Sequence, residues 1–379
     1  MDVGVNQSVS PTVLLRYKDL HDFELQDPTR VIEWIGDKSI CVAGYDSCKR
    51  NEILQLLVPQ RLNAKQNQGL CPERDLKVEH GGFSDYPVYS LIRIPDSNLL
   101  LTSGPGTDKV QVWQIGAEDN DVIKPVSTVT SEAGSEMWTK LATTASTSPR
   151  VLHGSQANGV QLTEIESSKP IYTLGVTSSD AIGTLSFLDC NTFHLCCVNG
   201  RQYIADVRQP QVCAEGCVAP ASLSSVQWCA AVKPGLPETS CHIASLSSEG
   251  HVTVTDSRDL SEPLKCAKLK FSDPAPTNHF LCVRWAPVLD NCISVSGLDG
   301  TVQIYDTQSW DATLQAQDAV FIHKGHSVLG TCNGAGSLPR ITAHAWHPWK
   351  ERIVLSAATD GSFHVWDWTD SQTKRQHNS

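Results

Sequence analysis

One strand–turn–strand pattern recurs along this chain. It is clearest in "GLDGTVQIYD" (residues 297–306) and returns in looser form as "AATDGSFHVWD" (residues 357–367). Both stretches have small residues, an acidic residue and Gly at a tight turn, apolar residues at alternate positions, and an aromatic residue followed by Asp. This order is typical of a β-hairpin with one buried face. The chain is therefore predicted to consist of repeated β units.

Weaker copies extend the pattern towards the N-terminus. They lie at residues 44–58, 103–114, 154–164, 197–206 and 247–256. Successive copies end about 50 residues apart, and a further β-like segment precedes each one. A unit of this size cannot bury both faces of its sheet alone. Seven such sheets arranged radially cover one another, so we expect a single all-β, seven-bladed propeller over residues 1–368.

The last unit carries the most specific residues. It contains a Gly-His pair at residues 325–326, followed by Ser356, the turn residue Asp360 and a Trp-Asp pair at residues 366–367. Together with the repeat, these residues resemble the WD40-repeat β-propeller family. The resemblance implies a buried, hydrogen-bonded tetrad formed by His326, Ser356, Asp360 and Trp366. It therefore implies a structural role for His326 rather than a role as a ligand.

The last unit lacks an outermost strand of its own. Only a polar tail, residues 369–379, follows the final strand pattern. The segment "HDFELQD" (residues 21–27) alternates apolar and acidic residues as an edge strand does. We expect this segment to close the ring by pairing with the C-terminal blade. The preceding "SPTVLLRYKDLH" (residues 10–21) has the spacing of a short helix, so residues 1–27 are expected to supply a helix and the closing strand.

Two polar stretches interrupt the rhythm of the repeat. They span residues 61–80 and residues 311–339. Long connections on a rigid scaffold are either mobile or functional, and we expect both stretches to be loops.

The overall composition is that of a folded, acidic chain. Hydrophobic residues make up 40% of the 379 residues, which is enough for a large core. The formal net charge of −11 opposes a sequence-independent grip on a phosphate backbone, so no direct contact with nucleic acid is expected. No apolar run reaches the roughly 20 residues of a membrane span, and the first residues lack a signal-peptide pattern. We expect a cytoplasmic protein with some nuclear presence and no membrane partner.

Patterns of catalytic chemistry are absent from the sequence. It contains no GxGxxG or Walker-type phosphate loop and no GxSxG elbow. Paired carboxylates such as Asp119 and Asp121 lie in a polar connection, which is typical of solvated loop acids. We therefore expect no enzyme, no catalytic residues, no cofactor and no small-molecule substrate, although propellers as a class do include enzymes.

Two histidine pairs and one cysteine pair are the alternatives for a metal site. His323 with His326, and His344 with His347, have a three-residue spacing that points side chains to opposite faces of a strand. The stretch "CAEGC" (residues 213–217) lacks the C-x2-C spacing of most zinc ribbons. Fourteen scattered cysteines without a secretory signal are typical of free thiols. No metal site is expected.

Binding to proteins remains as the expected activity, and hairpin turns on one rim of the propeller are its expected place. The longest turn is "YDSCKRNE" (residues 45–52). It places Tyr45 beside Lys49, Arg50 and Glu52, and Tyr and Arg are frequent among interface hot spots. These four residues are the candidate partner-binding loop; the alternative is an ordinary solvated turn.

Several stretches are similar to one WD-repeat family in particular, that of WD repeat-containing protein 73. They include "RVIEWI", "KRNEIL", "GLCPERDLKVEHGGFSD", "VIKPVSTV" and "FHVWDW". The resemblance implies a non-enzymatic cytoplasmic protein that associates with the RNA endonuclease module of the Integrator complex. It also implies a link to spindle poles and microtubule organisation in dividing cells.

Two functions therefore compete. The first is a scaffold or assembly factor that holds protein partners. The alternative is a structural protein associated with microtubules or spindle poles. An acidic chain is poorly suited to direct contact with acidic tubulin surfaces, so the first function is favoured.

Overall fold

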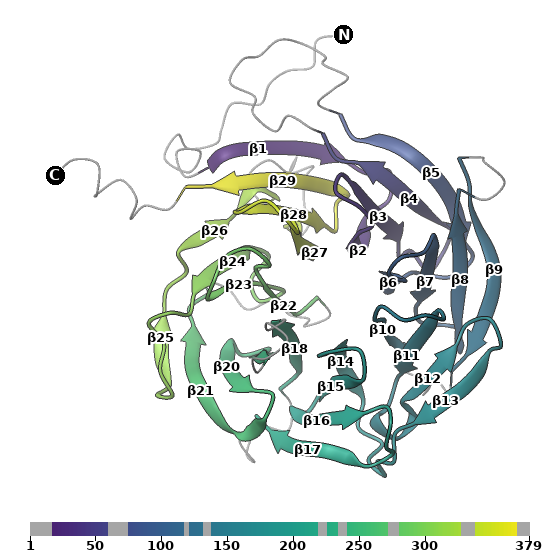
Figure 1. Cartoon of the computed structure of the whole chain (residues 1–379). Helices are drawn as coiled ribbons and strands as arrows, with labels where there is room; N and C mark the ends of the chain where they lie inside the picture. The colour runs from purple at the N-terminus through teal and green to yellow at the C-terminus, as the bar shows by residue number, and fades with distance from the viewer. Residues whose placement is uncertain are drawn as a thin grey trace, which may run out of the picture.

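Seven β-sheets stand side by side around a common axis and close into a ring (Figure 1). The computed structural model describes residues 17–59, 75–116, 121–131, 138–218, 226–233, 241–271, 280–326 and 338–369. In each sheet, or blade, one edge strand lies next to the axis and the other lies on the outside (Figure 1). The predicted seven-bladed, all-β propeller is confirmed. The described part of the chain has no helix of the length and hydropathy that a membrane span requires.

The first four blades follow the chain in order. From the axis outwards, blade 1 consists of β2 (Thr29–Trp34), β3 (Ser39–Gly44), β4 (Asn51–Leu57) and β5 (Lys77–Ser84), and blade 2 of β6 (Ser90–Arg93), β7 (Leu99–Ser103), β8 (Lys109–Ile115) and β9 (Ile123–Thr130). Blade 3 consists of β10 (Lys140–Ala142), β11 (Arg150–Gly154), β12 (Gln161–Glu164) and β13 (Lys169–Thr173), and blade 4 of β14 (Ile182–Phe187), β15 (Thr192–Cys197), β16 (Arg201–Asp206) and β17 (Val212–Cys217). A short 3₁₀ helix, η3 (Ala157–Gly159), precedes β12.

The last three blades depart from this simple order. Blade 5 consists of β18 (Trp228–Lys233), β19 (His242–Ser247), β20 (His251–Asp256), β21 (Asp259–Leu269) and β25 (Gln315–Gln317). Blade 6 consists of β22 (Cys282–Trp285), β23 (Cys292–Ser296), β24 (Val302–Asp306) and β26 (Phe321–His323). Blade 7 consists of β27 (Ile341–Trp346), β28 (Ile353–Ala358), β29 (Ser362–Trp368) and β1 (Tyr17–Glu24).

Apolar side chains pack between neighbouring blades. Between blades 7 and 1, Ile32 and Val42 lie in one buried cluster with Leu355 and Phe363. Burying a side chain of this size stabilises the fold by about 1.5–3 kcal/mol. Because each blade shares its core with both neighbours, the ring is stabilised only when it is complete.

The N-terminal strand closes the ring, as predicted. Strand β1 pairs antiparallel with β29, with Tyr17 opposite Trp368 and Phe23 opposite Phe363. The strand begins and ends earlier than the expected residues 21–27. The helix expected over residues 10–21 is wrong for residues 17–21, while residues 10–16 lie outside the described residues.

A β-bulge explains the helix-like spacing. The register of β1 shifts between Tyr17 and Asp19, so Tyr17 and Leu20 both pack against the cluster that contains Trp366 and Trp368. Residues three apart share a face in a bulged strand as well as in a helix. Pairing with β29 therefore decides the structure of this segment.

The two polar interruptions are not simple loops. In the segment 61–80, β5 begins at Lys77 and forms the outer strand of blade 1, whereas residues 60–74 lie outside the described residues. In the segment 311–339, β26 is the outer strand of blade 6, and β25 pairs in parallel with β21 of blade 5. Sheet edges that offer unpaired backbone groups explain why polar residues form strands here. Residues 327–337 of this segment are outside the described part.

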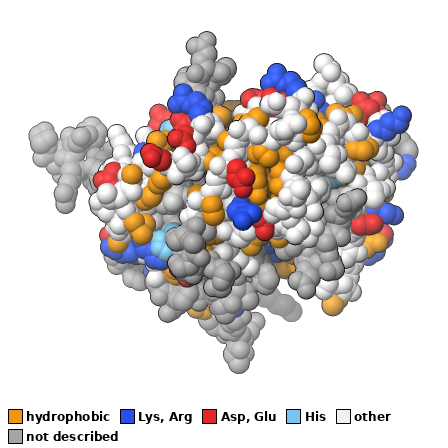
Figure 2. Space-filling model, turned by 90° about the horizontal axis from the view of Figure 1, so that it is seen from below, with side chains coloured by type: hydrophobic (Ala, Val, Ile, Leu, Met, Phe, Trp, Pro, Cys, Tyr) orange, Lys and Arg blue, Asp and Glu red, His pale blue; other side chains and the backbone are white. Residues whose placement is uncertain are grey.

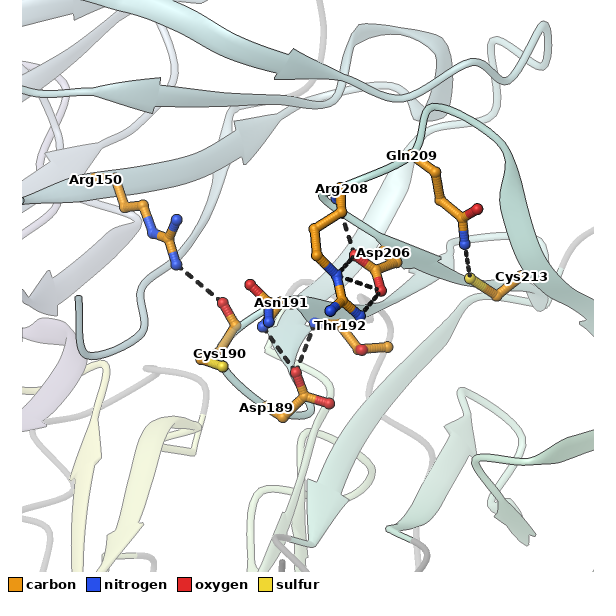
Figure 3. Close-up of polar contacts among 9 residues, drawn as sticks. All are labelled: Arg150, Asp189, Cys190, Asn191, Thr192, Asp206, Arg208, Gln209 and Cys213. Carbon is orange, nitrogen blue, oxygen red and sulfur yellow. Dashed lines mark hydrogen bonds and ion pairs between the residues drawn. The ribbon is translucent and has the colours of Figure 1, made fainter. Parts of the chain in front are cut away.

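The Asp residue that ends the repeat shapes the turn after the third strand of a blade. In blade 4, Asp206 Oδ1 accepts a hydrogen bond from the backbone N–H of Arg208 at 2.9 Å, and the Arg208 guanidinium bonds both carboxylate oxygens (Figure 3). Asp256 and Arg258 repeat this arrangement in blade 5. A carboxylate that accepts a backbone N–H two residues ahead favours a tight turn. The recurrence of Asp at this position thus has a structural cause.

The outer side of the ring carries charges of both signs. Figure 2 shows the side on which β17 lies, where acidic and basic side chains are interspersed and apolar side chains gather between them. Exposed apolar residues on outer strands include Ile171 on β13 and Leu264 on β21. The visible part of this side does not form a single basic field of the kind that phosphate backbones attract.

Removing the closing strand should destabilise the whole ring. Deletion of residues 1–24 is expected to make the protein insoluble or to lower its Tm sharply, because β29 would expose an unpaired edge and the apolar cluster around Trp366. Thermal melts and soluble yield measure the effect. Deletion of residues 1–16 alone keeps β1 and should leave the Tm close to that of the full chain. Equal Tm values for the two deletions would contradict the role of β1.

Candidate functional site

A central channel runs between the innermost strands of all seven blades. It forms an open cavity of about 620 Å³, and its described lining residues come from β2, β6, β10, β14, β18, β22 and β27 and from residues next to them. These lining residues include three cations, Arg30, Lys140 and Arg284, and one carboxylate, Glu33. The channel is therefore a locally basic site in an acidic chain.

Aromatic residues gather at one end of this channel. Tyr89 directly precedes the inner strand β6. Trp138 and Phe280 lie two residues before the inner strands β10 and β22, and Tyr45 directly follows β3. The inner strands start at the same end of the ring, because every blade repeats the same strand order. We call this end the channel mouth and define it by six residues: Arg30, Tyr45, Tyr89, Trp138, Lys140 and Phe280.

Three aromatic rings surround the guanidinium of Arg30. Its Cζ atom lies 4.1 Å from the ring centre of Tyr89 and 4.7 Å from that of Trp138. The distance to the ring centre of Phe280 is 5.0 Å. Tyr45 extends this group, because its ring packs edge-on against the rings of Tyr89 and Phe280 with centres 6.2 Å apart in each case. Cation–π contacts of this kind contribute about 0.5–2 kcal/mol each.

Lys140 places a second cation against the same tryptophan. Its Nζ atom lies 3.2 Å from the ring centre of Trp138. Burial, followed by the nearby charge of Arg30, holds the pKa of Lys140 well below its usual value. Burial also lowers the pKa of Arg30. Both shifts reflect partial removal from water, and the shift of Lys140 also reflects the positive charge of Arg30 nearby.

The four residues of the predicted partner-binding loop have different contacts. Tyr45 belongs to the channel mouth, whereas Lys49 forms an ion pair with Asp27. Arg50 Nε bonds Asp85 Oδ1 at 2.8 Å and the guanidinium lies over the Phe83 ring.

Glu52 is not in the turn at all. It belongs to β4 and stands opposite Phe83 of β5. The turn itself is held by Asn51, whose side chain accepts a hydrogen bond from Asp46 N and donates one to Asp46 O. Of the four predicted residues, only Tyr45 lies at the channel.

The sequence argument missed the other five residues of the channel mouth. They lie near the starts of four different inner strands, β2, β6, β10 and β22, so no local motif marks them. The signal that could have found them is the position just before each predicted inner strand: "VYSLIRIP" and "MWTKLATT" both place an aromatic residue there.

The predicted tetrad residues lie together in blade 7, in a chain of hydrogen bonds. Trp366 Nε1 donates to Ser356 Oγ at 3.1 Å, and Ser356 Oγ lies 2.8 Å from His326 Nε2. On the other side of the imidazole, His326 Nδ1 lies 2.6 Å from Ser362 Oγ, and Ser362 Oγ donates to Asp360 Oδ1 at 2.6 Å. Asp360 therefore reaches His326 only through Ser362, which the sequence argument did not identify.

The direction of these bonds fixes the tautomer of His326. The Asp360 carboxylate only accepts, so Ser362 must donate to it and accept from His326 Nδ1–H. His326 Nε2 is then an acceptor and receives the Ser356 hydroxyl proton. Burial holds the pKa of His326 well below its usual value, which agrees with a neutral ring.

A buried group of three histidines surrounds the tetrad. His323 Nε2 lies 3.2 Å from His364 Nδ1, and the rings of His326 and His364 stack with centres 3.7 Å apart. Their candidate ligand atoms all lie within 4.8 Å of one another. The expectation that His323 and His326 point apart is wrong, because β26 ends at His323 and the chain leaves the strand before His326.

Hydrogen bonding already uses this histidine group. Both nitrogens of His326 contact serine hydroxyls, and His323 Nδ1 lies 2.8 Å from the hydroxyl of Tyr17 on the closing strand. A metal ion would have to displace these bonds. The group therefore has the contacts of a structural network that joins β26, β29 and β1.

The second histidine pair is separated in the structure. His344 Nε2 and Nδ1 lie 2.8 Å and 2.9 Å from the hydroxyls of Ser294 and Ser296, which tie blade 7 to blade 6. His347 instead packs against the ring of Trp34 with centres 4.7 Å apart.

Seven blades and a histidine-serine-tryptophan network in the last of them define a WD-repeat β-propeller. No family model matches the chain. The sequence is 63% identical over 354 residues to the Integrator complex assembly factor WDR73 of Xenopus laevis, covering 93% of this chain and 96% of that protein. It is 46% identical to the protein of the same name from Mus musculus (94% and 96% covered) and 44% identical to that from Homo sapiens (93% and 95% covered). The chain belongs to the WDR73 family.

Ser356 is the node of the tetrad network, so its removal should be costly. Ser356→Ala would leave Trp366 Nε1 without its acceptor and His326 Nε2 without its donor inside the core. We expect a loss of about 1–3 kcal/mol in the free energy of unfolding, measured by denaturant titration. Asp360→Ala is the matched comparison: Asp360 is exposed, so its loss should cost less than about 1 kcal/mol. A larger effect at Asp360 than at Ser356 would contradict this network.

Buried neutral histidines should make the fold sensitive to acid. Burial lowers the pKa of His153, His194 and His364 to about 4 each, from an ordinary value of 6.5. The unfolded chain takes up these protons first, so the stabilising contribution is complete above about pH 6.5 and is lost as the pH falls towards about 4. Thermal melts should show a Tm that falls steadily from about pH 7.5 to about pH 4.5. His364→Asn should make this dependence shallower, and a Tm that is constant over this range would contradict the prediction.

Proposed function

We propose that this chain is a non-enzymatic assembly factor of the Integrator complex. The observation that carries the proposal is identity of 44–63% over nearly the whole chain to proteins named as Integrator complex assembly factors. Relatives this similar over their full length share a fold and the main features of its surface.

The fold supports a binding role. Blades that share buried cores form a scaffold, and the channel mouth holds half-buried aromatic and cationic side chains. The buried histidines contact structural partners and have lowered pKa values, so they fit a packing role better than proton transfer. The protein is therefore proposed to hold partners without turning over a substrate.

The partner and the location are proposed from the family resemblance. We infer that the chain acts in the cytoplasm on the RNA endonuclease module of Integrator. A link to spindle poles and microtubules stays a prediction of the same resemblance. Salt-sensitive pelleting of the pure protein with microtubules would support direct contact.

Loss of this protein should reduce the amount of assembled Integrator. In cells depleted of it, we expect less of the endonuclease subunits to co-purify with a tagged subunit from another part of the complex, measured by quantitative mass spectrometry. Re-expression of the wild-type chain should restore the yield. Tagged-subunit recovery that is unchanged by depletion would overturn the proposed function.

A further inference from the structure

We propose that the channel mouth binds an acidic segment of a protein partner, with one carboxylate held between Arg30 and Lys140. The proposal rests on the proposed function only in that the partner is a protein. It adds the place of binding and the chemistry that is recognised.

The aromatic group of the channel mouth cannot serve as a cage for a partner's cation. Its rings already face two cations of the chain itself: Arg30 lies among Tyr89, Trp138 and Phe280, and Lys140 lies on Trp138. A lysine or arginine from a partner would enter a site with two like charges nearby. The site is therefore built to attract the opposite charge.

The shape of arginine favours a carboxylate in particular. Aromatic rings pack against the faces of a guanidinium, while its N–H groups point outwards in the plane of the group. Arg30 already hydrogen-bonds the Tyr89 side chain, and this bond and the surrounding rings hold the guanidinium in place. A planar guanidinium matches the two oxygens of a carboxylate. A positioned guanidinium loses less conformational entropy on binding than a free side chain.

Charge balance points in the same direction. Arg30 Cζ and Lys140 Nζ both lie within 5 Å of the Trp138 ring centre, and the charge of Arg30 lowers the pKa of Lys140. No carboxylate among the described residues forms an ion pair with Lys140. An incoming carboxylate would relieve this repulsion. The channel lining has more cations than carboxylates, although the net charge of the whole chain is −11.

The size of the site sets the form of the partner. A cavity of about 620 Å³ admits a few side chains but not a folded domain. An extended segment with an Asp or Glu, crossing the channel mouth, therefore fits best. Tyr45 and Phe280 at the edge would contact apolar groups beside the carboxylate.

A random peptide library tests this recognition without reference to any partner. Immobilised full-length protein is used to select from a phage-displayed library of linear peptides. Lys140→Glu serves as the changed site, Lys140→Arg as the conservative change, and Lys49→Glu as a matched reversal away from the channel. Circular dichroism melts check that each variant is folded, and Lys140→Gln replaces Lys140→Glu if that variant melts early.

We expect selected peptides to be rich in Asp and Glu. Fluorescence anisotropy with the best peptide should show binding about tenfold weaker for Lys140→Glu, and little change for Lys140→Arg and Lys49→Glu. Replacing its acidic residues with Asn and Gln should weaken binding equally. A library that yields basic peptides, no charge preference or no binders overturns the proposal. So does affinity that survives Lys140→Glu, or a labelled single-stranded RNA that binds the mouth more tightly than the peptides.

The same variants separate this inference from the proposed function. If Lys140→Glu still restores Integrator assembly in depleted cells and still binds acidic peptides, the inference fails while the assembly role stands. If the wild type binds acidic peptides through Lys140 but does not affect Integrator, the assembly role fails alone.

Discussion

The antiparallel pairing of β1 with β29 is the contact on which the rest of the molecule depends. Every blade of the ring shares its core with two neighbours, so an opening anywhere exposes apolar surface on both sides of the break. Blade 7 is the place where the two ends of the described chain meet. Tyr17 adds a side-chain hydrogen bond to His323 of blade 6, so the closing strand joins two blades rather than one.

Closure also organises the channel. The seven inner strands are held at fixed angles around the axis, and single residues near their starts converge although they are far apart in the sequence. Arg30 comes from blade 1, Trp138 from blade 3 and Phe280 from blade 6. The ring centres of Trp138 and Phe280 lie 4.7 Å and 5.0 Å from Arg30 Cζ. A binding site of this kind requires a complete ring, which links the stability of blade 7 to recognition at the channel mouth.

The periodic features of the sequence predicted the architecture well, because a repeat of alternating residues leaves few ways to bury its faces. Features that depend on partners distant in sequence were harder to predict. The short strands β25 and β26 lie in a polar stretch and form only because sheet edges are available to them. Ser362 links His326 to Asp360 through its hydroxyl group, and no local sequence pattern distinguishes this serine from others. The channel mouth escaped notice because its six residues are spread over four blades, with one or two from each. The loop that looked richest in chemistry had its cations paired with Asp27 and Asp85.

The way in which the ring is closed has a consequence for its covalent order. Tyr17 stands opposite Trp368, so the two ends of the described chain lie within one pair of strands (Figure 1). The ends of the chain could therefore lie at another place in the ring without a change in the folded structure. A circular permutant, joined at blade 7 and opened in an exposed connection between two other blades, would keep every strand pairing and the same channel. The linear order of the blades and the geometry of the binding site are in this sense separable.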